Sequence, residues 1–136
     1  MATITAIEGI AEAKADKLRA AGIRTTEALL ENANTKKRRE KLSAETKISE
    51  KQILTWVNHA DLMRIKGVSG QYSELLEAAG VDTVKELKTR NADNLAEAME
   101  KKNSARKNRL VKRTPSAKVV QKWIDQAKSL KPVVKH

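Results

Sequence analysis

The sequence predicts an all-α protein in a single domain, built from two copies of one helical repeat. Apolar residues make up 40% of the chain, whereas aromatic residues make up only 2% and phenylalanine is absent. Such an aliphatic, alanine-rich composition favours packed helices over a sheet. No segment shows the alternating apolar pattern that is typical of a strand. The repeat becomes visible when the sequence is shifted by 58 positions against itself.

The two copies open at Ile7 and Ile65. The segment IEGIAEAKADKLRAAGIRTTEAL aligns with IKGVSGQYSELLEAAGVDTVKEL. The matched positions are Gly9 and Gly67, Leu18 and Leu76, Ala20–Gly22 and Ala78–Gly80, Ile23 and Val81, Thr25 and Thr83, and Leu29 and Leu87. An ordered set of this kind indicates an internal duplication. We therefore expect repeat one over 3–63, repeat two over 64–131 and a short tail over 132–136, all within one domain of residues 1–136.

Local signals predict the helices of each copy. Gly22 and Gly80 follow apolar periodic runs, where a helix ends in a left-handed conformation that suits glycine. Thr25 and Thr83 then stand at N-cap positions, and Glu86 completes a capping box with Thr83. These signals, with the apolar spacing, predict helices over 12–21, 25–32, 35–43, 49–63, 70–79, 83–89, 91–102 and 116–129.

A second similarity, at a shift of 67 positions, links two helices that each carry a tryptophan. ISEKQILTWVNHADL aligns with PSAKVVQKWIDQAKSL, which pairs Trp56 with Trp123. Because both lie on apolar helix faces, we expect them to pack in the core, with stacking on bases as the alternative. Tyr72 is expected in the core or at its rim. In the last helix, the residues spaced to face the core are Val119, Val120, Trp123, Ile124, Ala127 and Leu130.

The net charge of +11 is concentrated toward the C-terminus. Residues 101–136 hold twelve basic residues against Asp125 alone, whereas residues 61–100 are net acidic. Between the last two helices lies a basic loop over 103–115, long enough to suggest mobility or function. Like charges at this density favour contact with a polyanion. The candidate residues are Lys101, Lys102, Arg106, Lys107, Arg109, Lys112, Arg113, Lys118 and Lys122.

A second basic run comprises Lys36, Lys37, Arg38, Arg39 and Lys41. A run of this kind most often forms a solvated helix face, which is the interpretation we favour. Contact with a phosphate backbone is the alternative.

Each copy opens with a turn in which a glycine stands between apolar residues. The turns Ile7–Ala11 and Ile65–Ser69 resemble the loop of the helix-hairpin-helix motif, which reads apolar–x–Gly–apolar–Gly. A glycine turn that leads into a helix directs backbone amides at one spot, which suits an anion. The resemblance implies a fold of the SAM and helix-hairpin-helix type. It also implies paired hairpins that hold the phosphates of duplex DNA with little readout of the bases.

The two turns predict unequal sites. Ala11 and Ser69 stand where DNA-binding hairpins prefer a second glycine. In the first turn the candidates are Gly9, Ile10 and Ala11, and the neighbouring Glu12 would repel a phosphate. The second turn is better supplied with donors and basic residues. Its candidates are Arg64, Lys66, Gly67, Val68, Ser69, Gly70 and Gln71.

With both copies and both tryptophan helices placed, the chain is similar to a bacterial family known as domain of unknown function 4332. The similarity lies in ISEKQILTWVNHADLMRIKGV, LLEAAGVDTVKELKTRNADNL and RTPSAKVVQKWIDQAKSL, which follow one another in the family's order. The resemblance implies a tandem helix-hairpin-helix architecture and no established activity.

The sequence gives little support for catalysis. Its two histidines, His59 and His136, have no spaced partner, and no nucleophile or phosphate-cradling motif occurs. Without cysteine there is no disulfide or thiolate metal site, and we expect no metal, cofactor or small-molecule substrate. The start of the chain is unlike a signal peptide, and no apolar run reaches the roughly 18 residues of a membrane span. We therefore expect a cytoplasmic protein, with association with the nucleoid as one location.

The leading hypothesis is a non-sequence-specific nucleic-acid-binding protein, with double-stranded DNA as the favoured partner and RNA as another. Hairpin amides would hold phosphates, while the basic C-terminal region supplies long-range attraction. The alternative is a protein-interaction or scaffolding module, in which the basic region docks an acidic protein and nucleic acid is not contacted.

Overall fold

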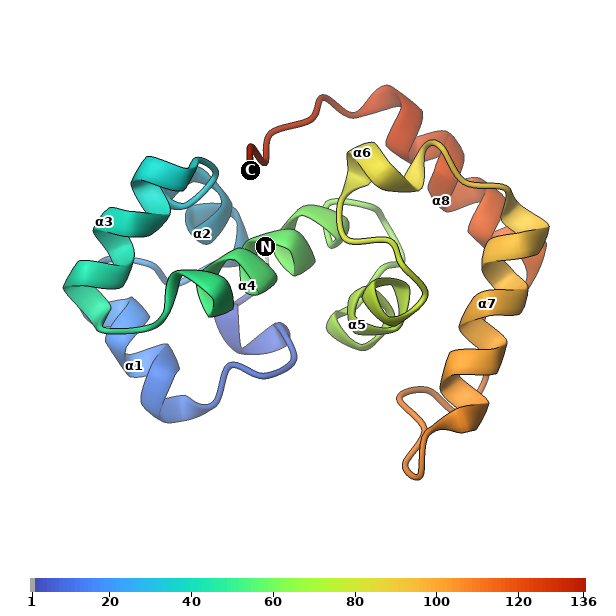
Figure 1. Ribbon diagram of the computed structural model, residues 1–136, viewed down its shortest axis with the longest axis horizontal. Helices are drawn as coiled ribbons and strands as arrows, with labels where there is room; N and C mark the ends of the chain where they lie inside the picture. The colour runs from blue at the N-terminus through green and yellow to red at the C-terminus, as the bar shows by residue number, and fades with distance from the viewer. Residues whose placement is uncertain (1) are drawn as a thin grey trace. The chain divides into compact units, whose positions relative to one another are not determined.

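The computed structural model describes residues 2–136, and over this range the chain is helical (Figure 1). Eight α-helices and one short 3-10 turn follow one another there. Extended pairing within the described range is limited to an isolated bridge between Thr3 and Thr25. The predicted all-α class is therefore confirmed for residues 2–136.

Contacts divide the chain into two compact units, which are described separately. Unit 1 comprises Met1–Asp61 and Val133–His136, and unit 2 comprises Leu62–Pro132. The repeats predicted from the sequence divide two residues later, between residues 63 and 64. That both repeats form one domain stays a prediction.

Unit 1 contains the 3-10 turn and the first four helices. They are η1 (Ile4–Ala6), α1 (Glu12–Ala20), α2 (Thr26–Asn32), α3 (Lys36–Thr46) and α4 (Glu50–Leu62), the last residue of which belongs to unit 2. The turn η1 packs against α1 and α2, and α2 packs against α3. The core is aliphatic apart from one indole, and its largest members are Ile4, Ile7, Leu18, Ile23, Leu29, Ile53 and Trp56.

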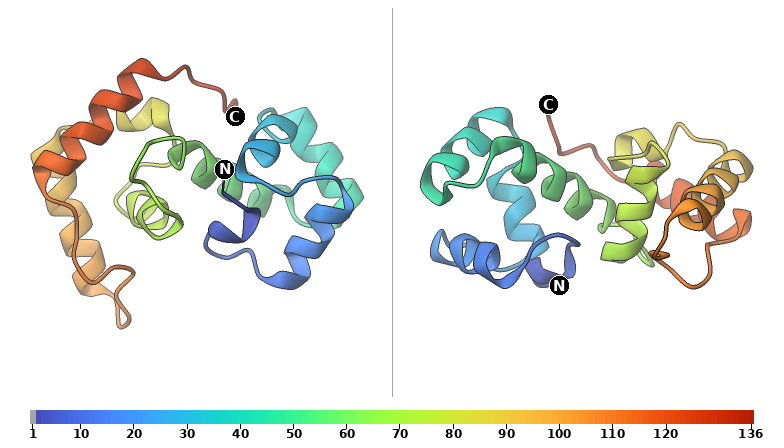
Figure 2. Two further views of the ribbon diagram at one scale, coloured as in Figure 1. Left: turned by 180° about the vertical axis from the view of Figure 1, so that it is seen from behind. Right: turned by 60° about the horizontal axis from the view of Figure 1, so that its bottom comes forward.

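Unit 2 contains the remaining helices, α5 (Gly70–Ala78), α6 (Val84–Leu87), α7 (Ala92–Ala105) and α8 (Ala117–Ser129). α8 packs along α7 and against α6, and α7 also contacts α5 (Figure 2). The buried stripe of α8 consists of Val120, Trp123, Ile124 and Ala127. The prediction that Val119 faces the core is wrong, because Val119 lies at the edge of this stripe and is 38% exposed.

The helix boundaries follow the local capping signals. N-cap hydroxyls accept hydrogen bonds from the amide three residues on: Thr25 from Ala28, Thr83 from Glu86 and Ser116 from Val119. Each satisfies a donor that the helix start would otherwise leave open. The eight predicted helices are confirmed, with starts within one residue. Two helices run beyond their predicted ends, α3 to Thr46 and α7 to Ala105.

The turns after α1 and α5 have the same backbone conformation. Gly22 has a φ of +88° and Gly80 a φ of +96°. In both turns, the amide that follows the glycine donates to the carbonyl five residues earlier, at 2.9 Å. These are Schellman turns, in which a left-handed residue closes the helix. The 58-residue shift found in the sequence thus holds for the backbone as well.

A buried arginine ties the C-terminal residues to the rest of unit 1. Arg39 is 3% exposed, and it donates from Nη1 to the carbonyl of Ala33 (2.9 Å) and from Nη2 to that of Lys135 (2.6 Å). The Lys135 amide in turn donates to the carbonyl of Asn34 at 2.8 Å. Burial lowers the pKa of Arg39 below its ordinary value. The other members of the second basic run are exposed, namely Lys36, Lys37, Arg38 and Lys41.

Replacing Arg39 with methionine should destabilise unit 1 and release the C-terminal residues. The carbonyls of Ala33 and Lys135 would lose a charged donor, which costs about 2 to 3 kcal/mol. Urea unfolding measures this loss, and digestion with carboxypeptidase measures release of the tail. Lys37→Met, at an exposed position of the same helix, is the control. Equal unfolding free energies for the two variants would show that the hydrogen bonds of Arg39 do not stabilise unit 1.

Candidate nucleic-acid interface

The two glycine turns that open the repeats fold in the same way. Gly9 has a φ of +92° and Gly67 a φ of +97°, a region that residues with a side chain rarely occupy. The amide after each glycine donates to the carbonyl three residues earlier, at 3.3 Å in the first turn and 3.1 Å in the second. The turns therefore lead into α1 and α5 with the same geometry.

A tryptophan lies beneath each of these glycines. A Cβ atom on Gly9 would lie 3.7 Å from Nε1 of Trp56, and one on Gly67 would lie 3.3 Å from Nε1 of Trp123. Both tryptophans are 3% exposed. The expectation that they pack in the core is confirmed. Each glycine turn packs directly against the indole of its unit.

The residues that cover the two indoles are themselves 58 positions apart. In unit 1 the ammonium of Lys14 lies 5.7 Å from the centre of the Trp56 ring, a cation–π contact. In unit 2 the ring of Tyr72 lies 5.4 Å from that of Trp123, tilted by 57°. Tyr72 is half-buried, at the rim of the core. The same position of the repeat therefore carries a cation in unit 1 and an aromatic ring in unit 2.

Hydrogen bonds decide which amides of the second turn are open to a ligand. The Lys66 amide donates to Oε1 of Gln126 (3.0 Å), and Nε2 of Gln126 donates back to the Lys66 carbonyl (3.3 Å). The Val68 amide is used within the turn, and the Tyr72 amide donates to Oγ of Ser69 at 3.3 Å. Within the described chain, the exposed residues of this turn whose amides have no acceptor are Gly67, Ser69 and Gln71.

The first turn is followed by an acidic side chain at the start of α1. Ala11, at the N-cap of α1, provides no side-chain cap. Glu12 follows it and accepts a hydrogen bond from Arg19 at 3.2 Å, while Asp16 accepts one from the same guanidinium at 3.0 Å. The bond to Glu12 raises the pKa of Arg19. The charge of Arg19 is thus balanced by two exposed carboxylates, one of which, Glu12, directly follows the first turn.

The loop between α7 and α8 is ordered by one buried asparagine. Asn103 is 3% exposed and lies in the last turn of α7. Its Nδ2 donates to the Val111 carbonyl at 2.9 Å. Its Oδ1 accepts from the amides of Leu110 (2.9 Å) and Val111 (3.3 Å). These three bonds attach the middle of the loop to α7.

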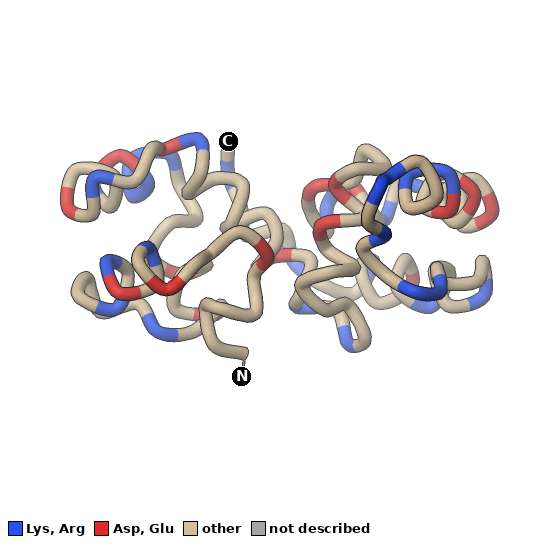
Figure 3. Tube along the Cα trace, turned by 90° about the horizontal axis from the view of Figure 1, so that it is seen from below, with Lys and Arg blue, Asp and Glu red and all other residues tan. Residues whose placement is uncertain are grey.

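Five cations of this loop are exposed and have no acidic partner. They are Arg106, Lys107, Arg109, Lys112 and Arg113. Among residues 2–136 none of them forms an ion pair. Glu100, on the neighbouring face of α7, instead binds the hydroxyls of Thr114 and Ser104. Figure 3 marks the basic and acidic positions along the chain.

The loop and the start of α5 share a groove of about 530 Å³ in unit 2. Its lining residues are Gln71, Tyr72, Arg109, Leu110, Val111, Lys112 and Arg113. Three of the seven are cationic and none is acidic. Gln71 and the basic residues from Arg109 onward are at least 38 positions apart in the sequence. They therefore meet on one surface only in the folded unit. This groove is the candidate interface.

The other predicted basic residues lie outside the lining of the groove. Lys101 pairs with Glu97 at 3.3 Å. Arg64 is partly buried at the entry to the second turn. The exposed members of the remaining set are Lys66, Lys102, Arg106, Lys107, Lys118 and Lys122.

Sequence reasoning missed the role of Asn103, although a signal was present. Leu95, Met99 and Asn103 are spaced four residues apart and occupy the buried face of α7. A polar residue that continues an apolar stripe must find hydrogen-bond partners when it is buried. Its partners, however, lie seven and eight residues further on in an irregular loop, where spacing alone does not predict contacts.

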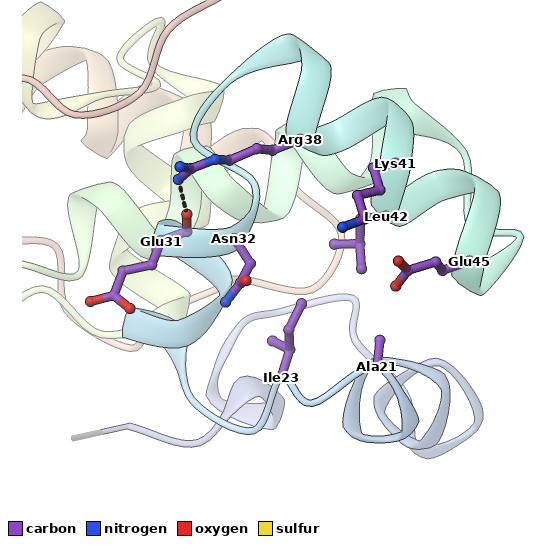
Figure 4. Close-up of a pocket in the computed structure, with 8 residues that line it drawn as sticks. All are labelled: Ala21, Ile23, Glu31, Asn32, Arg38, Lys41, Leu42 and Glu45. Carbon is purple, nitrogen blue, oxygen red and sulfur yellow. Dashed lines mark hydrogen bonds between the residues drawn. The ribbon is translucent and has the colours of Figure 1, made fainter.

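Unit 1 has a hollow of a different character, with a volume of about 510 Å³ (Figure 4). It lies between the turn after α1, the end of α2 and one face of α3. Its lining residues are Ala21, Ile23, Glu31, Asn32, Arg38, Lys41, Leu42 and Glu45. Arg38 reaches across to donate to the Glu31 carbonyl at 2.7 Å. With two acidic and two basic residues, this hollow has no net charge and does not favour a polyanion.

The structure thus defines an all-helical protein with two similar glycine turns and a basic groove beside the second. A family model described as a domain of unknown function (DUF4332) matches residues 8–130, and the chain belongs to this family. Comparison with curated proteins and comparison with solved structures gave no match. Among the described residues, no helix is long and apolar enough to cross a membrane. Nor do residues 2–136 contain a group of three or more potential metal ligands.

Replacing Asn103 with alanine should free the basic loop without unfolding unit 2. The variant loses the acceptor of two amides and the donor to Val111, which favours local opening of the loop by about 2 kcal/mol. Limited trypsin digestion followed by mass spectrometry should show faster cleavage between Arg106 and Arg113. Asn108→Ala, at an exposed position of the same loop, is the control. Equal cleavage rates in the two variants would contradict the assignment.

Proposed function

We propose that the protein binds nucleic acid without sequence specificity, chiefly double-stranded DNA, and that unit 2 carries the site. The observation that supports this most directly is the groove in which Arg109, Lys112 and Arg113 lie beside the start of α5. Cations without acidic partners and amides at a helix start both favour a phosphate. RNA has the same phosphates and is a second possible substrate.

We further propose that the two units are helix-hairpin-helix elements. Matching φ values at Gly9 and Gly67, matching turn hydrogen bonds and matching Schellman turns support one repeated hairpin. In the second hairpin, Gly67, Ser69 and Gln71 present amides toward solvent. A hairpin of this kind holds phosphates with backbone groups, so it positions a duplex and leaves the bases unread.

The two hairpins would have different roles. Ser69 caps α5 and is followed by Gly70, whereas Ala11 cannot cap α1 and is followed by Glu12. A phosphate at the first turn would meet the carboxylates that surround Arg19. We therefore assign phosphate binding to the second hairpin and a structural role to the first. A protein of this kind would act in the cytoplasm, with the nucleoid as its site of association.

Titration of a mixed-sequence duplex at several salt concentrations tests this proposal. Neutralising about four to eight phosphates should give a log–log slope of roughly −4 to −7. The triple variant Arg109→Gln, Lys112→Gln and Arg113→Gln should make the slope shallower by about 2 to 3, since each lost phosphate contact removes about 0.9. The triple variant Lys36→Gln, Lys37→Gln and Lys41→Gln changes the charge equally in unit 1. It should change the slope by less than about 1.

Two results would contradict the proposal. One is the absence of duplex binding at about 50 mM salt, where phosphate contacts are strong. The other is an equal change of slope in both triple variants, which would show that net charge acts and that the groove does not.

A second candidate function is protein interaction or scaffolding, and the hollow of unit 1 favours it. Its balanced charges suit a protein segment better than a polyanion. The basic region of unit 2 would then dock an acidic protein without contact with nucleic acid.

Affinity capture after nuclease treatment distinguishes this second function. A protein partner should still be retained, and Lys41→Glu should abolish its retention by reversing a charge in the hollow. Lys37→Glu, at an exposed position outside the hollow, should retain it. Capture that disappears with nuclease treatment would speak for nucleic acid instead.

A further inference from the structure

The groove of unit 2 has an apolar side as well as a cationic one. Tyr72 and Leu110 form the apolar side, and Arg109, Lys112 and Arg113 supply the charge. A groove that served only to hold the outer phosphates of a duplex would gain nothing from an aromatic ring. The volume of about 530 Å³ lies within the range of about 300–1,000 Å³ in which proteins enclose small organic groups.

Tyr72 lines the groove and packs against the core of unit 2. Its ring packs on Trp123 at 5.4 Å, and its amide is bound by the Ser69 hydroxyl in the first turn of α5. It is half-buried, and its own hydroxyl forms no hydrogen bond with any residue from 2 to 136. A fixed aromatic ring with an open hydroxyl can contact a flat apolar ligand that also carries polar groups.

Leu110 completes the apolar side because Asn103 fixes its backbone. The Leu110 amide donates to Oδ1 of Asn103, and its side chain packs against the core of unit 2. The cations on either side of it are therefore presented at defined positions around an apolar centre. In the sequence Arg109-Leu110-Val111-Lys112, two cations flank two apolar residues, and all four line the groove.

We infer that this groove takes an unpaired nucleotide, with the base against Tyr72 and Leu110 and the flanking phosphates on Arg109 and Arg113. The inference rests on the proposed function, because it concerns the same groove. Every base has an apolar face that stacks on an aromatic side chain, whereas in an intact duplex that face is covered by neighbouring bases. The preferred substrate is therefore DNA that contains unpaired nucleotides, as at a gap. An acidic peptide offers the charge but lacks the flat face.

The experiment compares two labelled DNA probes by fluorescence anisotropy at one salt concentration. One is an intact hairpin duplex, and the other is the same duplex interrupted by a gap of about four unpaired nucleotides, a small site for single-strand binding. The wild-type chain should bind the gapped probe about tenfold more tightly, within the range that one stacked base contributes. Tyr72→Leu, which keeps an apolar side chain and removes the ring, should lower the ratio of the two affinities from about ten to about one.

Tyr72→Phe is the matched control, since it keeps the ring and should keep most of the preference. Circular dichroism verifies that all three chains are folded. Equal binding of the two probes by the wild-type chain overturns this inference while leaving the proposed function in place. An unchanged preference in Tyr72→Leu overturns it as well, as does equally tight competition by polyglutamate. Failure to bind either probe overturns both this inference and the proposed function.

Discussion

Each unit depends on a glycine turn that sits directly on an indole. Glycine is favoured in both turns because φ is positive, and at Gly67 a Cβ atom would also lie within 3.3 Å of the indole, a tight contact. The indole comes from a helix far along the chain, 47 residues after Gly9 in unit 1 and 56 residues after Gly67 in unit 2. This contact therefore joins the first turn of a unit to its last helix. It also fixes the start of α1 and of α5, because each of these helices begins three residues after the glycine.

The two units share this glycine turn and indole but differ in the side chains that surround them. Lys14 became the counterpart of Tyr72, Ala11 that of Ser69, and Glu12 that of Gly70. None of these exchanges alters the turn, since the hydrogen bonds and φ values remain matched. All of them alter what the surface can attract. A shared backbone therefore does not determine the charges and hydrogen-bonding groups that each unit presents.

What could be predicted from the sequence was local. The helices followed from residues three or four apart, as with Thr83 and the amide of Glu86, where the physical cause is contained within one turn of helix. The groove depends on contacts that spacing does not encode, such as Asn103 with Val111. Arg39 is a second example. In the sequence it is one more cation of a basic run, whereas in the structure it donates a hydrogen bond to the carbonyl of Lys135, 96 residues away. Helix capping depends on residues within one segment, whereas burial depends on how the whole unit folds.

The way in which the basic loop is stabilised bears on its purpose. Five uncompensated cations in eight residues repel one another, and the usual structural remedy is an acidic partner, as Glu97 is for Lys101. Here the loop is held instead by the neutral amide of Asn103, which bonds the backbone and leaves every charge in place. Glu100 is close in sequence, yet its carboxylate is occupied by hydroxyl groups. A loop ordered by neutral bonds keeps its full charge and loses little conformational entropy on binding, and both properties increase its affinity for an anionic partner.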